Sequence, residues 1–292
     1  MYPRLVSILL LALGCALAPL PASNLRMEAS TTWAQNINRA SAPGDWRDAQ
    51  TLQLRTAWSA LREWQTGLIT RGEFSAGFAR VPRFTRLDAF TAGASGHLRK
   101  KFGLGAFAPV LSLEAGLQAR EARLAGDDGW MANGALSLGK RLTPSWRVAA
   151  TGDWQQHAAE GPMFDTRHHR LFGTITWDIT DRWSLSHGNG RLWGDFTANA
   201  SPTVWPRALS GALGRNISDY YATIPWNVTD AFGPGWVTYR VAGHVSFWWL
   251  ELSPAIGRNT ALPLRYESLF SVNKVGVKYR QDVWSLQVLH RF

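Results

Sequence analysis

The chain has 292 residues, of which 46% are hydrophobic and only 18% are charged, and it carries a formal net charge of +10. Its basic residues are scattered singly through alternating segments and form no basic tract, which argues against a nucleic-acid partner. Sixteen tryptophans and 27 glycines are instead typical of a β-sheet that carries aromatic side chains at two membrane interfaces.

The N-terminal segment has the pattern of a secretory signal peptide, with a short basic head before an apolar run over residues 5–18. We predict a signal peptide over residues 1–22, with cleavage near Ala22. Lipidation at Cys15 is an alternative, and otherwise the one cysteine of the chain leaves with the signal peptide. No later segment reaches the roughly 18 consecutive apolar residues of a transmembrane helix, so strands are the remaining way to span a membrane.

The remaining residues, 23–292, alternate between apolar and polar side chains in segments separated by clusters of Gly, Pro, Asp and Asn. This period of two is typical of strands with one face toward lipid and the other toward a lumen. Because open sheet edges are not tolerated in lipid, the pattern predicts a single domain, a transmembrane antiparallel β-barrel. About twelve strands are expected, near residues 28–38, 48–62, 66–80, 86–99, 107–122, 130–141, 145–157, 165–179, 183–196, 236–250, 263–273 and 279–292.

The final strand indicates the compartment. One of its faces carries Trp284, Leu286, Val288, His290 and the terminal Phe292. A last strand that ends on an aromatic residue is typical of barrels in the outer membrane of Gram-negative bacteria. We therefore expect two partners, namely outer-membrane lipid around the barrel and the barrel-assembly machinery at the strand ending at Phe292.

With both ends in the periplasm, alternate connections face the periplasm and the exterior. Short periplasmic turns are predicted at residues 62–65, 100–107, 142–145, 180–182 and 253–260. External connections are predicted at residues 41–48, 122–129 and 158–164, together with a long loop near 197–235. This difference in length is expected of outer-membrane barrels.

The long external loop contains aromatic residues of its own, among them Trp205, Tyr220, Tyr221 and Trp226. A loop of this length is often functional or folds inward as a constriction. The alternative is a lid that packs on the barrel mouth and protects these aromatic residues from water.

The alternation separates two predicted faces. The lipid face would carry Leu52, Leu54, Trp58, Leu111, Leu113, Leu117, Leu136, Leu138, Trp146, Val148, Trp154, Leu171, Ile175, Trp177, Ile179, Val237, Tyr239, Val241, Val245 and Phe247. The lumen would be lined by Arg55, Arg71, Glu73, Glu114, Arg120, Arg147, Asp153, Arg170, Asp178, Arg240, His244, Arg265 and Glu267, with Gln53 and Gln118.

Arginines outnumber acids among these lumen candidates, which would favour anions. The first functional hypothesis is therefore a porin-like channel for small anionic or saccharide solutes. Arginines and acids at similar depth also pair across small barrels and fill them, so a plugged structural barrel that works through its external loops is the alternative.

A second alternative is an outer-membrane hydrolase of lipid or lipopolysaccharide, which would need a nucleophile, a base and an orienting group together. The candidate sets are His168 with His169 and Asp165, His187 with Ser186 and Asn189, and His244 with Ser246. Ser186 and His187 face opposite sides of one strand, as neighbouring strand residues do, and His244 and Ser246 share a face but have no identifiable third member. None of these sets is therefore complete, and we predict no catalytic residue and no metal site. The glycines of residues 187–194 (HGNGRLWG) precede no helix, so they predict a bend, a bulge or close packing rather than a cofactor.

Two short segments resemble known barrels. Trp33 to Ala40 (WAQNINRA), followed by a charged outer loop and a returning strand, resembles the start of the barrel domain in surface lipoprotein assembly modifiers and polysaccharide-export porins. Tyr279 to Asp282 (YRQD), followed by SLQVLHRF, resembles the end of uncharacterised proteobacterial outer-membrane barrels. This resemblance implies a barrel that takes part in polysaccharide or lipoprotein export.

Overall fold

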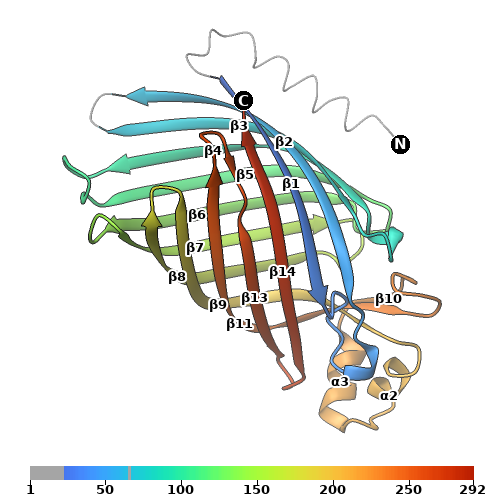
Figure 1. The fold of residues 1–292 in the computed structure, drawn as a ribbon. Coiled ribbons are helices and arrows are strands. Elements are labelled where there is room, and N and C mark those ends of the chain that lie inside the picture. Colours follow the sequence, from blue (N-terminus) through green and yellow to red (C-terminus); the bar gives the residue numbers. More distant parts are fainter. Residues whose placement is uncertain (1–22, 65–66) are drawn as a thin grey trace.

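The structure, a computed structural model, describes residues 23–64 and 67–292. The predicted signal peptide, including Cys15, lies outside these residues. Within the described ranges, twelve strands form a closed antiparallel β-barrel (Figure 1). The first strand pairs with the second along one edge and with the last strand along the other, which closes the sheet. No helix in these ranges is long and apolar enough to cross a membrane.

The barrel strands are β1 (Ser23–Gln35), β2 (Ala49–Trp64), β3 (Leu68–Arg80), β4 (Ala89–Lys101), β5 (Val110–Ala122), β6 (Gly129–Arg141), β7 (Trp146–Ala159), β8 (Thr166–Thr180), β9 (Trp183–Ala200), β11 (Val237–Ile256), β13 (Leu264–Asn273) and β14 (Lys278–Arg291). Two short strands, β10 (Trp226–Val228) and β12 (Thr260–Ala261), pair at the ends of the barrel. The twelve predicted strands are confirmed. The clearest difference is at β1, which begins at Ser23 rather than near residue 28, because its first residues pair with β2 from Ala60 onward.

The outward face is apolar. Leu54, Leu136 and Leu171 are 50%, 52% and 58% exposed although they belong to regular strands. Trp146 and Trp177 stack on this face at 5.6 Å between ring centroids, near the ends of β7 and β8. A sheet without open edges and with an apolar exterior meets the requirements of a lipid bilayer, and this fold places the chain in the outer membrane.

Connections differ in length between the two ends of the barrel. At the end where β1 begins, the described connections reach at most eight residues, at 102–109, and residues 142–145 and 181–182 make tight turns. At the other end, residues 36–48 and 201–236 make the two longest loops, and the second of these contains two helices, α2 (Trp205–Leu209) and α3 (Arg215–Thr223). The longer loops therefore mark the extracellular end.

The prediction for the two faces of β11 is wrong. The buried residues Val245, Phe247 and Trp249 point into the lumen, whereas His244 shares the exposed outer face with Trp248. By the same alternation, Val237, Tyr239 and Val241 lie on the inner face, and Arg240 lies on the outer one. The physical reason is that both faces of this strand are apolar, so its alternation does not identify the side that meets lipid.

The external loops cover the barrel mouth with two apolar clusters. In one, Trp205 of α2 and Tyr221 of α3 pack on the inner face of β11, with Trp205 stacked on Tyr239 at 4.8 Å between centroids. The other cluster joins five loops through Ile37, Phe84, Leu124, Met163, Phe164, Phe232 and Trp236. The long loop and its neighbours thus form a lid on the mouth, which was one of the two alternatives drawn from the sequence.

Candidate functional site

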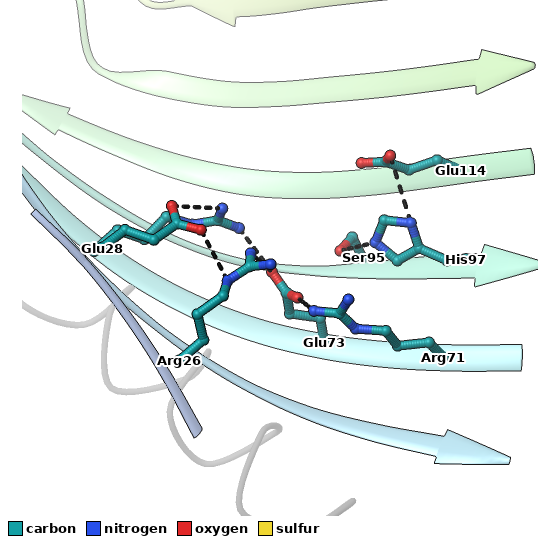
Figure 2. A network of polar contacts seen from close by, with 8 residues as sticks. Arg26, Glu28, Arg71, Glu73, Ser95, His97 and Glu114 are labelled. Atoms are coloured by element: carbon teal, nitrogen blue, oxygen red, sulfur yellow. Dashed lines mark hydrogen bonds and ion pairs between the residues drawn. The ribbon is translucent and has the colours of Figure 1, made fainter. Parts of the chain in front are cut away.

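The lumen of the barrel is the candidate site, and an ion-pair network lines its β1 to β5 side (Figure 2). Glu73 on β3 is only 4% exposed and lies between several guanidinium groups. Its carboxylate accepts hydrogen bonds from Arg55 at 2.9 Å and Arg26 at 3.4 Å, and it also pairs with Arg71. Glu28 extends the network through Arg26 at 2.8 Å. The cluster contains three arginines and two glutamates, so it has a net charge of +1.

Further ion pairs follow the lumen around the barrel. Asp178 on β8 pairs with Arg147 at 2.7 Å and with Arg141 at 3.2 Å. Asp153 accepts two hydrogen bonds from the Arg170 side chain, at 2.8 and 3.0 Å. Further pairs in the described lumen include His97–Glu114, Arg120–Asp127, His157–Asp127 and Arg265–Glu267. Such pairs fix the side chains against the wall and leave room in the lumen.

Most lumen residues predicted from the sequence lie on the inner face. Arg240 and His244 are the exceptions, and Arg240 instead pairs with Asp165 of a neighbouring loop. Sequence reasoning missed Arg26, because the predicted first strand began at residue 28, and it did not single out Glu28 at the start of that strand. Their alternation with Ser30 and Thr32 on β1 is the signal that identifies them.

Among the described residues, the lumen contains at least three cavities. One of 320 Å³ at the periplasmic mouth is lined by Arg99, Arg141 and Arg147. A second, of 370 Å³, has Arg71 and Arg99 in its wall. The third, of 360 Å³, lies beneath the external loops and is lined by Arg39, Arg170 and residues of β9, β11, β13 and β14. Arg99, which the sequence did not single out, lines two of the three cavities.

The opposite side of the lumen is apolar. Phe172 of β8, Phe196 of β9 and Phe247 of β11 point inward, and Phe172 meets Phe247 edge to face at 6.1 Å between centroids. Trp249 lies above Gly188, where an added Cβ would be 2.4 Å from the indole ring. The glycines of residues 187–194 therefore make room for inward aromatic rings. The lumen has a charged side and an aromatic side.

The first external loop brings another arginine into the lumen. Asn36 and Asn38 are fully buried and shape this loop: Asn36 Nδ2 donates to the Arg280 carbonyl at 2.7 Å, and Asn38 Oδ1 accepts from the Arg47 main chain at 2.9 Å. Arg39 lies in this loop between the two asparagines and β2, and its Nε donates a hydrogen bond to Gln281 of β14 at 3.4 Å. Burial lowers the pKa of the Arg39 guanidinium, and Glu267 opposes part of that shift.

The aromatic loop candidates stabilise the lid. Tyr221 and Tyr279 share a hydroxyl hydrogen bond of 2.9 Å, and the Tyr220 hydroxyl accepts from the Ala242 main chain at 3.2 Å. Desolvation raises the pKa of Tyr220 and of Tyr221. Trp205 is buried, whereas Trp226 is 43% exposed beside it.

The residues considered for hydrolysis are dispersed. Ser186 points into the lumen, while His187 and Asn189 lie on the outer surface of β9 near Trp248. His168 lines the lumen beside Arg170, and its neighbour His169 points outward by the alternation of β8. In the described part of the chain, no group of three or more His, Cys, Asp or Glu residues is placed to hold a metal ion.

No protein-family model matches the sequence, and no curated protein matches it. Solved structures do match the barrel. The COG4313 outer membrane channel from Pseudomonas putida F1 is similar over 95% of this chain and 98% of its own, with 12% identity and a TM-score of 0.59. The NanC porin is similar over 90% of this chain and 98% of its own, with 9% identity and a TM-score of 0.43. The first likeness shows a shared outer-membrane barrel fold.

Proposed function

We propose that the chain is a channel for small anionic or saccharide solutes. The observation that carries this proposal is the lining of the three lumen cavities, each of which has at least two arginines in its wall. Fixed cationic side chains in a low-dielectric wall raise the local concentration of anions. The resemblance to polysaccharide-export porins extends the proposal to acidic saccharides that leave the cell.

The lid supports a second candidate, a plugged barrel that works through its external loops. Its two apolar clusters bury aromatic residues that would otherwise meet water at the mouth. A channel with such a lid conducts when the loops move aside, whereas a plugged barrel does not conduct at all.

Barrel-assembly machinery is proposed as a partner through β14. The outward residues of this strand run from Trp284 to Phe292, and both of these end residues are exposed. This aromatic and aliphatic edge supports the prediction that the last strand directs insertion into the outer membrane.

Liposome swelling with glucose, glucuronate and glucosamine tests the channel, because these solutes are similar in size and differ in charge. We expect glucuronate to enter fastest and glucosamine slowest. An Arg99→Ala, Arg147→Ala double variant should reduce that difference. Arg191→Ala is the matched control, because Arg191 is exposed on the outer surface of β9. Entry of glucosamine faster than that of glucuronate would contradict the proposal. Exclusion of all three solutes, even from a barrel with the lid-loosening Asn38→Ala change, would also contradict it.

A further inference from the structure

The cavity beneath the lid differs from the other two because it joins the two sides of the lumen. Its volume is 360 Å³, near the lower end of the roughly 300–1,000 Å³ typical of small-molecule sites. One wall consists of Leu192, Phe196, Val245, Phe247 and Leu269. Polar side chains flank this wall, with Gln155, His168 and Arg170 on β7 and β8 and with Arg39 and Gln281 on the side of β14. The lining also includes Thr166, Asp195, Glu267, Ser271 and Tyr279.

Three arginines line this cavity. Arg170 is held by both oxygens of Asp153, and Arg280 pairs with Asp282 at 3.2 Å. The third, Arg39, has the Gln281 amide as the hydrogen-bond acceptor of its side chain, and Glu267, whose charge acts on it, already pairs with Arg265 at 3.0 Å. Asp195 also lines the cavity, but among the described residues Arg39 is the lining arginine whose side chain makes no ion pair. An enclosed charge of this kind is stabilised by a counter-ion.

The shape and position of Arg39 suit such a role. Arginine remains protonated in proteins and offers a planar set of donors that fits a carboxylate. The buried asparagines on either side of residue 37 hold the loop that carries it, so the guanidinium is placed before any solute arrives. Preorganisation of this kind favours binding because less ordering is needed when the solute enters.

We propose that this cavity is a binding site for an organic anion with an apolar body, such as an aromatic carboxylate, whose carboxylate meets Arg39 and whose ring lies against Phe247, Val245 and Leu269. The proposal rests on the proposed channel function and narrows its solute class. A uronic acid would also satisfy Arg39, but any hydroxyl group that faced Leu192, Phe196 or Val245 would find no hydrogen-bond partner on those side chains. Unpaired buried hydroxyls cost free energy, so this wall favours an apolar body over a sugar, although Ser271 and Tyr279 also line the cavity.

Calorimetric titration of the mature, detergent-solubilised barrel with benzoate, galacturonate and benzyl alcohol tests the site. Benzoate carries the ring and the charge, galacturonate carries the charge without the apolar body, and benzyl alcohol carries the ring without the charge. We expect saturable binding of benzoate, at least tenfold tighter than that of the other two. Equal or tighter binding of galacturonate, or no binding of benzoate, would overturn the proposal.

Two variants test the contributions of Arg39 and of the apolar lining to binding separately. Arg39→Gln should weaken benzoate at least tenfold and leave benzyl alcohol unchanged, whereas Leu269→Asn should weaken benzoate and benzyl alcohol together. Arg215→Gln is the control for lost charge, because this residue lies on α3 with its side chain 93% exposed. Resistance of the folded barrel to unfolding in detergent, measured for each variant, separates lost binding from lost structure. Benzoate binding that is unchanged in folded Arg39→Gln would also overturn the proposal.

These experiments distinguish failure of the proposed binding site from failure of the proposed channel. Anion-favouring swelling without benzoate binding would contradict the site and support the channel. Benzoate binding by a barrel that admits no solute, even with a loosened lid, would keep the site and remove the channel.

Discussion

Asn199 on β9 donates a hydrogen bond from Nδ2 to the main-chain oxygen of Asn38 at 2.9 Å. Asn38 lies in the loop after β1, and the two residues are 161 positions apart. The same loop makes a second contact just after the end of β9, where Asp45 accepts a hydrogen bond from the main chain of Ser201 at 2.9 Å. The lid and the position of Arg39 therefore depend on contacts between loops that close only when the whole barrel has formed.

Loss of the Asn38 side chain should loosen the lid. Asn38→Ala removes an acceptor for Arg47 and a donor to the Asp45 carbonyl, both in a buried setting. Each unsatisfied buried group costs about 1–3 kcal/mol. We expect faster solute entry in liposome swelling and a lower midpoint of unfolding in urea. Asn227→Ala is the control, because Asn227 is exposed and its side chain bonds only to the next residue among the contacts described. Equal rates in Asn38→Ala and in the unaltered barrel would show that the loop does not limit entry.

Glu73→Gln should strengthen anion selectivity and weaken the barrel. The change leaves Arg26, Arg55 and Arg71 with less compensating charge around a carboxylate that is 4% exposed. Breaking a buried pair costs about 3–5 kcal/mol, and the partly hydrated lumen reduces this figure. The measurements are the reversal potential in a salt gradient and the urea midpoint. Asp219→Asn, on α3 with its side chain 71% exposed, should change neither quantity.

The orientation of β11 can be tested with single cysteines. The chain has one cysteine, Cys15, in the predicted signal peptide, so the mature barrel offers a thiol-free background. A spin label at Trp248→Cys should be relaxed by oxygen dissolved in lipid, whereas a label at Phe247→Cys should not. The opposite pattern would restore the face assignment drawn from the sequence.

Gly188→Ala should be poorly tolerated because its Cβ would meet the Trp249 ring at 2.4 Å. Overpacking of this kind typically costs about 1–3 kcal/mol. Gly152→Ala is a matched control on β7, since the nearest atoms to its added Cβ lie at 4.0 Å. Urea unfolding of both variants measures the difference in stability, and equal midpoints would mean that the Trp249 ring moves aside at little cost in free energy.

Strand number and most strand boundaries follow from local alternation, which is why they could be predicted from the sequence. Most strands have one clearly polar face, but β11 has Val245, Phe247 and Trp249 on one side and Trp248 and Leu250 on the other. Its only acid, Glu251, shares a face with Trp249 and pairs in register with Arg265 of β13. That polar residue is the local signal that identifies the inner face.

The lid could be predicted only as one of two alternatives, from the length and the aromatic residues of its loop, and the cavity beneath it could not be predicted because it has no local signal. Arg39 occupies a charged loop like many others, and its place in the lumen depends on Asn199, Arg280 and Gln281, which lie far away in sequence. The WAQNINRA segment was singled out by resemblance, and the structure gives its two asparagines a physical role in shaping that loop. Contacts of this range are set by the closed barrel and not by sequence periodicity.

The central claim is that the lumen conducts anions in preference to cations. Single-channel recording of the refolded mature protein in planar bilayers, with reversal potentials in a salt gradient, tests it most directly. The unaltered barrel and Asn38→Ala should be recorded side by side. We predict discrete steps, more frequent in Asn38→Ala, and a reversal potential of the sign expected for anions. Cation selectivity, or two folded barrels that show no steps, would contradict the claim.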